Sequence, residues 1–205
     1  IYEIIQNNAI EDYFPTLSKN EIYFQKQIDY DFNYIGSFRS APERTYYQKP
    51  KASDKVLSDG TGYIDQIIEW EENFSWEYKN LLSSIADLEL FYDVKSTKLK
   101  GGRFELNVKT HRNTNFASLA DVGFGVSQFL PIIIADLQLN DYSCLAVSQP
   151  EIHLHPKIQA AFGNYIAKKI NGEKKQYILE THSEYFLNRI RLLLIKGELK
   201  SEDVK

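Results

Sequence analysis

The sequence predicts an α/β fold in which a parallel sheet is flanked by helices. Two short apolar runs, residues 143–147 and 176–179, each stop abruptly at polar residues, which is typical of buried parallel strands whose ends open onto a site. Segments with helical spacing of apolar residues alternate with these runs, at residues 125–139, 156–170 and 183–195. Strands that alternate with helices in this order indicate a parallel sheet.

The first third of the chain has a different pattern. Residues 1–26 give only weak signals for a helix and a strand, and residues 30–38 read as a further strand. Prolines, glycines and serines predict a loop over residues 40–62. Apolar residues at helical spacing then predict one helix over residues 63–85.

A β-hairpin follows this helix. Residues 88–95 and 103–109 alternate apolar and polar side chains, and two glycines, Gly101 and Gly102, lie between them. This pattern indicates two antiparallel strands joined by a tight loop. The helix and the hairpin form an insertion ahead of the alternating second half, so we divide the chain into residues 1–115 and 116–205.

The composition is that of an ordinary globular chain. Its 205 residues suffice for one domain or a domain and a half, and 43% of them are hydrophobic and 25% charged. The formal net charge of -4 gives no global attraction to nucleic acid, so contact with DNA would need a local patch or another part of the protein. A nucleic-acid-binding module without ATP chemistry is disfavoured by this acidic balance and by the lack of a basic aromatic surface.

Cysteine usage and the apolar runs favour a cytoplasmic location. The single cysteine, Cys144, cannot form an intrachain disulfide, which fits a reducing compartment. No secretory signal is visible, and the longest apolar run, residues 129–135, is far too short to cross a bilayer. We therefore expect no membrane partner.

The most informative residues follow the two predicted strands of the second half. The first strand continues as Ser-Gln-Pro-Glu-Ile-His-Leu-His-Pro over residues 148–156, and the second ends in Glu-Thr-His-Ser over residues 180–183. Ligands of open α/β sheets bind at the carboxyl ends of the strands. These two segments are therefore the predicted site.

This pair of segments resembles the second half of an ABC-type P-loop ATPase head, in the branch of AAA-family proteins related to SMC, RecF and OLD ATPases. The similarity is dense over residues 118–200 and thinner upstream, at residues 34–39 and 42–44. It implies the C-terminal lobe of a P-loop NTPase fold.

The phosphate-binding pattern Gly-x-x-x-x-Gly-Lys-Ser/Thr does not occur in the sequence, which starts at Ile1 and contains no methionine. We therefore expect the Walker A lobe of the same polypeptide to lie upstream. By itself this chain is expected not to hydrolyse ATP.

Glycines precede the predicted helix over residues 125–139. Free amides at a helix N-terminus favour an anion, although a tight turn into the helix is the simpler interpretation. By resemblance, residues 121–128 are the ABC signature loop, which contacts the γ-phosphate of ATP held by the opposite head. The nucleotide-binding residues that this implies are Gly123, Gly125, Ser127 and Gln128. Gly123 stands where the signature serine is usual, and whether Ser127 substitutes for it stays open. Replacing Gly125 by Glu is predicted to weaken ATP-dependent dimerisation without unfolding the chain.

The end of the first strand departs from the ABC pattern. The resemblance places the Mg²⁺-binding acid at Ser148 and the acid that polarises the attacking water at Gln149. A glutamine can orient a water but cannot take its proton, and a hydroxyl brings no negative charge to Mg²⁺. Either hydrolysis is slow, or Glu151 or Glu180 supplies the missing carboxylate, or the head binds ATP as a structural clamp.

Three histidines lie in the two segments. His182 follows the second strand, where the resemblance makes it the switch histidine that contacts the γ-phosphate or positions the water; a histidine satisfied in a turn is the alternative. The spacing of His153 and His155 could bind a metal, but no third ligand is close in sequence. The resemblance makes both part of the turn at the interface between heads.

Other basic residues receive structural interpretations. Arg39 and Arg44 are interpreted as salt-bridge partners of the acidic surface rather than as phosphate-facing groups. Two lysine pairs, at residues 168–169 and 174–175, flank an Asn-Gly sequence and predict a solvated turn.

The sequence thus predicts part of an ATPase that holds ATP and Mg²⁺ between two heads in a homodimer. Gln149, His182 and Glu151 are the candidate catalytic residues, with Ser148 at the metal. By resemblance, such heads often serve bacterial defence or DNA repair together with an effector nuclease. The alternative is a non-catalytic scaffold or sensor that acts through protein interfaces, and Ser148 in place of the acid favours it.

Overall fold

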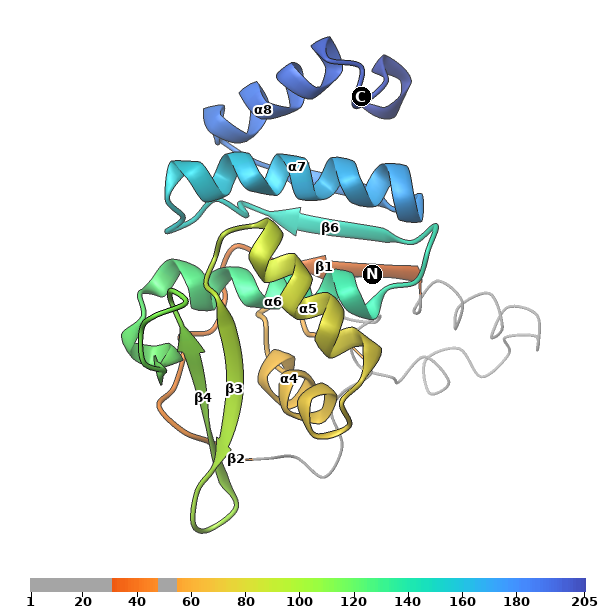
Figure 1. Cartoon of the computed structure of the whole chain (residues 1–205). Helices are drawn as coiled ribbons and strands as arrows, with labels where there is room; N and C mark the ends of the chain where they lie inside the picture. The colour runs from red at the N-terminus through yellow and green to blue at the C-terminus, as the bar shows by residue number, and fades with distance from the viewer. Residues whose placement is uncertain (1–30, 48–54) are drawn as a thin grey trace, which may run out of the picture.

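The computed structural model of the protein describes residues 31–47 and 55–205. A three-stranded parallel sheet with the order β1-β6-β7 forms the centre of the described chain, and a small antiparallel sheet lies beside it (Figure 1). The parallel strands are β1 (Phe32–Ile35), β6 (Cys144–Ser148) and β7 (Gln176–Glu180). The predicted α/β fold with a parallel sheet is confirmed. The elements expected over residues 1–26 lie outside the described residues.

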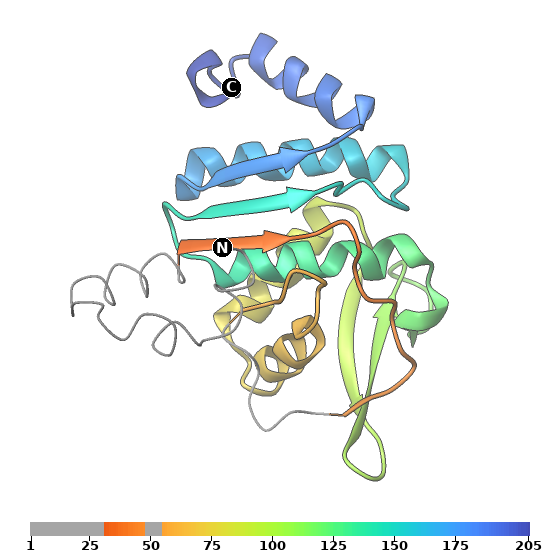
Figure 2. The ribbon, with the colours of Figure 1, turned by 180° about the vertical axis from the view of Figure 1, so that it is seen from behind.

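Helices cover one face of the parallel sheet. Seen from behind, the three strands lie in front of α6 (Phe124–Gln138) and α7 (Pro156–Glu173) (Figure 2). The row Ile35, Val147 and Leu179 comes from paired positions on the three strands and joins the hydrophobic core. On the other face of the edge strand β7, Ile178 is 63% exposed.

Local capping signals set the starts of the helices in the second half. The His155 side chain accepts a hydrogen bond from the backbone N–H of Lys157, and Pro156 occupies the first turn of α7. Ser183 caps α8 (Glu184–Ile195) by accepting from the N–H of Phe186 at 3.0 Å. These boundaries agree with the prediction to within three residues.

Three phenylalanines join these helices through the core. Phe129 of α6 lies 5.0 Å from Phe162 of α7 in an edge-to-face contact, and Phe162 lies 5.8 Å from Phe186 of α8, measured between ring centroids. The resulting core is continuous from the parallel sheet into the insertion.

The predicted single helix over residues 63–85 is in fact two helices, α4 (Tyr63–Glu72) and α5 (Trp76–Asp87). The chain turns at Phe74, whose φ is 48°, and Ser75 then caps α5 by accepting from the N–H of Tyr78. The Ser75 cap starts a second helix at this point, so the first helix does not continue through it. Both helices contact α6.

The predicted hairpin is confirmed, with a later start. β3 (Asp93–Lys98) pairs with β4 (Arg103–Lys109) around Gly101 and Gly102, which both have positive φ. Two short strands extend this sheet along β4: β2 (Tyr46–Tyr47), which lies within the expected loop, and β5 (Ala117–Ser118). Short 3-10 helices, η1 (Leu119–Asp121) and η2 (Ser201–Asp203), complete the described elements.

Two of the four lysines expected in a solvated turn, Lys169 and Lys175, are buried, so that interpretation is wrong for them. Lys175 donates to the backbone carbonyl of Asp136 at 2.6 Å and lies 2.9 Å from the carboxylate of Glu173. Lys169 bonds Glu173 at 2.6 Å and lies 3.9 Å from Asp136, whose side chain is fully buried. The buried carboxylate of Asp136 in α6 thus stabilises both cations inside the fold.

None of the described helices combines the length and apolar character needed to span a bilayer. The division at residue 115 stays a prediction, although β1 from the first part pairs with β6 from the second.

Candidate functional site

The candidate site lies where β6 and β7 end and α6 begins, at the left of Figure 1. Gly125 in the first turn of α6 is so close to the turn after β6 that a Cβ at this position would lie 2.2 Å from the carbonyl oxygen of His153. The ring of Phe124 also meets the His153 ring edge-to-face at 5.1 Å. Residues 121–128, here called the signature-like loop, therefore contact the segment after β6 (residues 148–156). Together with residues 180–183 after β7 they form the rim of the candidate site.

The strand ends bring a hydroxyl and a carboxylate together. Ser148 is the last residue of β6 and pairs with Glu180, the last residue of β7. The Ser148 hydroxyl donates a hydrogen bond to a carboxylate oxygen of Glu180. Ser148 is buried and Glu180 is exposed, so this carboxylate is accessible at the rim. Both groups offer oxygen ligands of the kind that Mg²⁺ takes.

Gln149 adopts a backbone conformation that non-glycine residues rarely adopt. Its φ is 47°. Its N–H donates to the carbonyl of Glu180 at 2.7 Å, and its carbonyl accepts from Arg39 at 3.1 Å. The chain thus turns sharply at the end of β6, directly beside the Ser148 hydroxyl.

Arg39 is buried and lies beneath this turn. One terminal nitrogen donates to the carbonyls of Gly36 at 2.9 Å and Ser148 at 3.2 Å, and the other donates to Gln149. Burial lowers the pKa of the guanidinium, and the nearby charge of Glu151 opposes that shift. The interpretation of Arg39 as a surface salt-bridge partner is therefore wrong: it bonds backbone carbonyls inside the fold.

Arg44, in contrast, forms the predicted salt bridge. Its guanidinium makes a two-pronged contact with the carboxylate of Asp121, at 2.7 and 3.1 Å. Asp121 is the last residue of η1 and the first of residues 121–128. The pair is exposed, so its contribution to stability is small.

Glu151 braces the turn after β7. Its carboxylate accepts from the Thr181 hydroxyl at 2.8 Å and from the backbone N–H of His182 at 2.7 Å. The two predicted segments are therefore hydrogen-bonded to each other across the strand ends. The His182 side chain is exposed at the rim. The catalytic roles of Gln149, Glu151 and His182 stay predictions.

The residues of the signature-like loop differ in what they expose. Gly123 is exposed with φ 98° and precedes the first turn of α6. Ser127 donates to the carbonyl of Phe124 at 2.8 Å, and Gln128 donates to the carbonyl of Ser40 at 2.9 Å. Both side chains are buried and hydrogen-bonded within the protein. Contact of these four residues with nucleotide stays a prediction, and backbone amides are the groups best placed for it.

The close packing at Gly125 bears on the expected effect of replacing it by Glu. Substituting Gly125 by Glu disturbs the packing as well as the charge, because a Cβ 2.2 Å from the carbonyl oxygen of His153 forces the backbone there to shift. That variant would therefore report packing as well as charge.

The two other histidines of the rim have structural contacts. His155 caps α7, and His153 packs on Phe124. Within residues 31–47 and 55–205, no group of three or more His, Cys, Asp or Glu side chains is arranged to hold a metal ion.

Sequence reasoning named Arg39 and Thr181 but missed the contacts by which they support the site. Arg39 is 109 positions from Ser148 in sequence, and Thr181 is 30 positions from Glu151. The sequence does show Thr181 beside His182, but nothing in it indicates that its hydroxyl meets Glu151.

A parallel sheet with polar groups at its strand ends, beside the N-terminus of a helix, offers a place for a ligand and for an anionic group. The chain matches the family model described as AAA ATPase domain over residues 2–187, and it belongs to that family. It is an AAA-type ATPase domain.

No curated protein matches the chain. Solved structures do match, among them one described as "Structural biochemistry of ATP-driven dimerization and DNA stimulated activation of SMC ATPases". That structure is 13% identical in sequence, with a TM-score of 0.45, and the similarity covers 60% of this chain and 77% of the other.

Proposed function

We propose that the chain is part of an ABC/SMC/OLD-like ATPase in which two heads hold ATP and Mg²⁺ between them and hydrolyse ATP slowly. The observation that carries this proposal is the contact between Ser148 and Glu180. It brings a carboxylate to the strand end at which the resemblance expects the Mg²⁺-binding acid and the sequence has serine. Glu180 then supplies the negative charge that Ser148 lacks.

The other rim residues take the remaining roles in this proposal. The Gln149 side chain orients the attacking water, and His182 contacts the γ-phosphate. Glu151 holds the turn that carries His182, as its two hydrogen bonds to that turn support. The backbone around Gly123 faces the nucleotide bound by the second head of a homodimer.

The exposed edge of β7 supports a Walker A lobe from the same polypeptide. In the described part of the chain, β7 pairs only with β6, and its Ile178 side chain is largely exposed. An edge strand offers unpaired backbone groups to another strand. A strand of the Walker A lobe added there would place the phosphate-binding loop at the same rim.

The wider setting follows from the resemblance. We propose a cytoplasmic protein that serves bacterial defence or DNA repair and acts on an effector nuclease when the heads close on ATP. The free thiol of Cys144 is consistent with a reducing compartment.

A non-catalytic scaffold is the second candidate. Ser148 itself favours it, because a hydroxyl is a weak ligand for Mg²⁺. Glu151 also has two donors inside the protein, which limits its use as a base. In that case ATP serves as a clamp or is not used.

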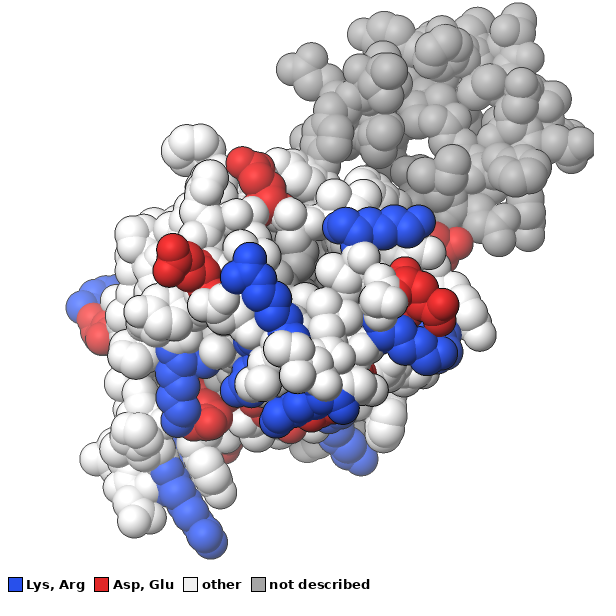
Figure 3. Space-filling model, turned by 90° about the horizontal axis from the view of Figure 1, so that it is seen from above, with Lys and Arg blue, Asp and Glu red and all other residues white. Residues whose placement is uncertain are grey.

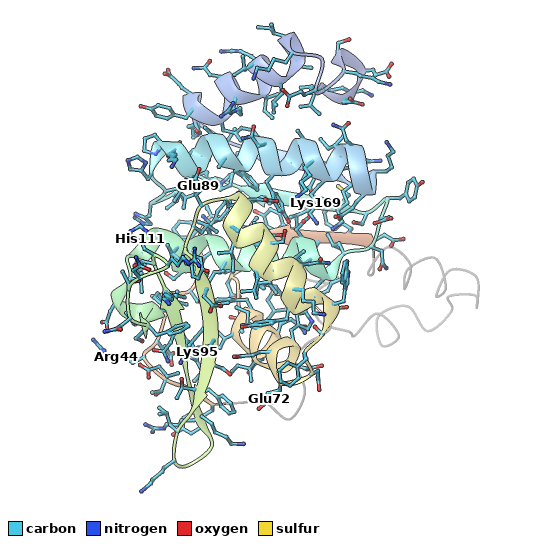
Figure 4. The ribbon with its side chains drawn as sticks, viewed as in Figure 1. Arg44, Glu72, Glu89, Lys95, His111 and Lys169 are labelled. Atoms are coloured by element: carbon cyan, nitrogen blue, oxygen red, sulfur yellow. The ribbon has the colours of Figure 1, made fainter. Side chains whose placement is uncertain are left out.

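Steady-state ATP hydrolysis by the full polypeptide separates the two candidates. His182→Ala removes one transition-state donor and is expected to lower the rate about a hundredfold. His111→Ala is the matched control, since His111 is an exposed histidine on the hairpin side of the molecule (Figure 4). If the full polypeptide does not hydrolyse ATP, or His182→Ala hydrolyses it at the wild-type rate, the ATPase assignment of this rim fails.

A further inference from the structure

The β3–β4 hairpin and the segment after it concentrate positive charge. Residues 92–116 contain six Lys or Arg and two acidic residues, a net charge of +4, whereas the whole chain carries -4. The six cations are Lys95, Lys98, Lys100, Arg103, Lys109 and Arg112. This segment is therefore basic although the chain as a whole is acidic.

None of these six cations forms an ion pair with another described residue. The ion pairs that the described residues form with each other lie elsewhere, for example Lys157 with Glu89 and Lys168 with Asp87. On the face seen from the α8 side, basic and acidic side chains lie next to one another (Figure 3). The hairpin differs from that face because its positive charges have no carboxylate partner among the described residues.

Aromatic rings lie beneath several of these cations. The Lys95 ammonium is 4.2 Å from the ring centroid of Phe116, and the Arg103 guanidinium is 5.0 Å from that of Tyr47. The Lys109 ammonium is 5.7 Å from the ring centroid of Tyr92. Tyr47 and Tyr92 are 65% and 52% exposed. The surface therefore offers rings as well as charge.

This arrangement corrects the sequence-based expectation that the chain lacks a basic aromatic surface. The expectation failed because Tyr47 comes from β2, far from the hairpin in sequence, and joins it only through the pairing of β2 with β4. Figure 4 shows Lys95 and His111 on the side of the molecule where α6 begins.

We propose that the β3–β4 hairpin, with Tyr47 and Phe116, is a nucleic-acid-binding surface that takes single-stranded nucleic acid. Lysines and arginines that have no carboxylate partner in the described part of the chain suit the phosphate backbone, whose neutralisation releases counterions. The exposed Tyr47 and Tyr92 rings suit stacking with unpaired bases, which tolerates any sequence. An acidic protein surface would match the charge, but it would leave these rings without a stacking partner.

The position of the surface links it to the rim. β5 pairs with β4 and continues through η1 to Gly123. Arg44 from the β2 side also bonds Asp121 of η1. Nucleic acid on the hairpin therefore acts on the segment that leads directly into the signature-like loop.

The test is fluorescence anisotropy of a labelled oligothymidylate with the full chain, without ATP. The hairpin variant combines Lys95→Ala, Arg103→Ala and Lys109→Ala. The control combines three lysines that have acidic partners, Lys157→Ala, Lys168→Ala and Lys196→Ala, so that both variants lose the same charge.

We expect the hairpin variant to bind at least about tenfold more weakly at about 50 mM salt, with a salt dependence reduced by roughly 2 in log–log slope. The control is expected to stay within about threefold of the wild type, because non-contacting charges act only through the overall field. Lys100→Glu, at the exposed hairpin loop, should weaken binding without touching a ring.

Circular dichroism is the check that each variant is folded. The proposal is overturned if the wild-type chain does not bind, or if the control loses as much affinity as the hairpin variant. Tighter binding of a duplex than of the single strand would overturn the single-strand assignment. None of these outcomes depends on ATP hydrolysis.

Discussion

The guanidinium of Arg39 donates a hydrogen bond of 3.1 Å to the backbone carbonyl of Gln149, whose φ of 47° lies in the left-handed region. The same side chain bonds the carbonyls of Gly36 and Ser148. A buried cation thus joins the ends of β1 and β6. It holds in place the residue at which the resemblance expects a water-orienting side chain.

Removing this cation should destabilise the protein. Arg39→Ala removes the hydrogen bonds that this side chain donates to three carbonyls, and we expect the free energy of unfolding to fall by about 2–4 kcal/mol. Urea unfolding followed by circular dichroism measures it. Arg44→Ala is the control, because the side chains of its ion pair with Asp121 are 72% and 46% exposed. Its loss should stay below about 1 kcal/mol. Equal losses in the two variants would contradict a structural role for Arg39.

Two glycines in helices should respond to alanine in opposite directions. Gly125→Ala places a Cβ against the carbonyl of His153 and is expected to destabilise by about 1–3 kcal/mol. Gly172→Ala, in α7, meets no atom within 4 Å and should stabilise by about 0.5–1 kcal/mol. Thermal unfolding compares them. A Gly125→Ala protein as stable as the wild type would show that the rim turn can move away from α6.

Local signals explain why the second half was predictable and the insertion was not. The apolar runs of β6 and β7, with Pro156 and Ser183 at the helix starts, lie within a few residues of the elements they set. The break before α5 was missed because Ser75 also fits the polar face of one continuous helix. Partners that are distant in sequence were also missed. Lys175 is buried because it bonds Asp136, which lies 39 positions earlier and which no local pattern connects to it.

The candidate site was predictable only in part. Adjacent parallel strands place their ends together, so a meeting of Ser148 with Glu180 follows from the motif positions. The support from Arg39 depends on how the chain after β1 folds back on β6, which no local pattern records. The contact of Tyr47 with Arg103 was not predictable either, because Tyr47 lies in β2, a two-residue strand within a segment predicted as a loop.

Tyr177, which bonds the buried Asp136 of α6, should make the free energy of unfolding sensitive to alkaline pH. Burial, and then the nearby Asp136, raise the pKa of Tyr177, whose hydroxyl donates to Asp136 at 2.8 Å. A raised folded-state pKa means that this stabilisation is fully present below the unfolded value near 10 and is lost as the pH rises through the folded value. Urea unfolding measures the free energy of unfolding at pH 8 and at about pH 10.5. This free energy should fall less between the two pH values for Tyr177→Phe than for the wild type. Tyr185→Phe, at an exposed position of α8, is the control and should lose as much as the wild type.

The contact between Ser148 and Glu180 yields a test of which residue provides the metal-binding charge. From the sequence alone, Ser148→Asp should raise hydrolysis by restoring an acid at the strand end. With Glu180 already there, the new carboxylate also repels its neighbour in the absence of a cation. We therefore expect Ser148→Asp to raise the ATPase rate of the full polypeptide only at saturating Mg²⁺.

Glu180→Gln isolates the carboxylate proposed to act in the natural sequence. It should lower the rate about a hundredfold, the usual effect of one lost transition-state interaction. Adding Ser148→Asp to that variant should restore activity, since one carboxylate then remains at the strand ends. Glu202→Gln, at an exposed position in η2, is the control and should leave the rate unchanged. A scaffold predicts instead that biological activity is untouched in all these variants. Wild-type ATPase activity in Glu180→Gln would show that the carboxylate at the strand end is not the source of the metal-binding charge.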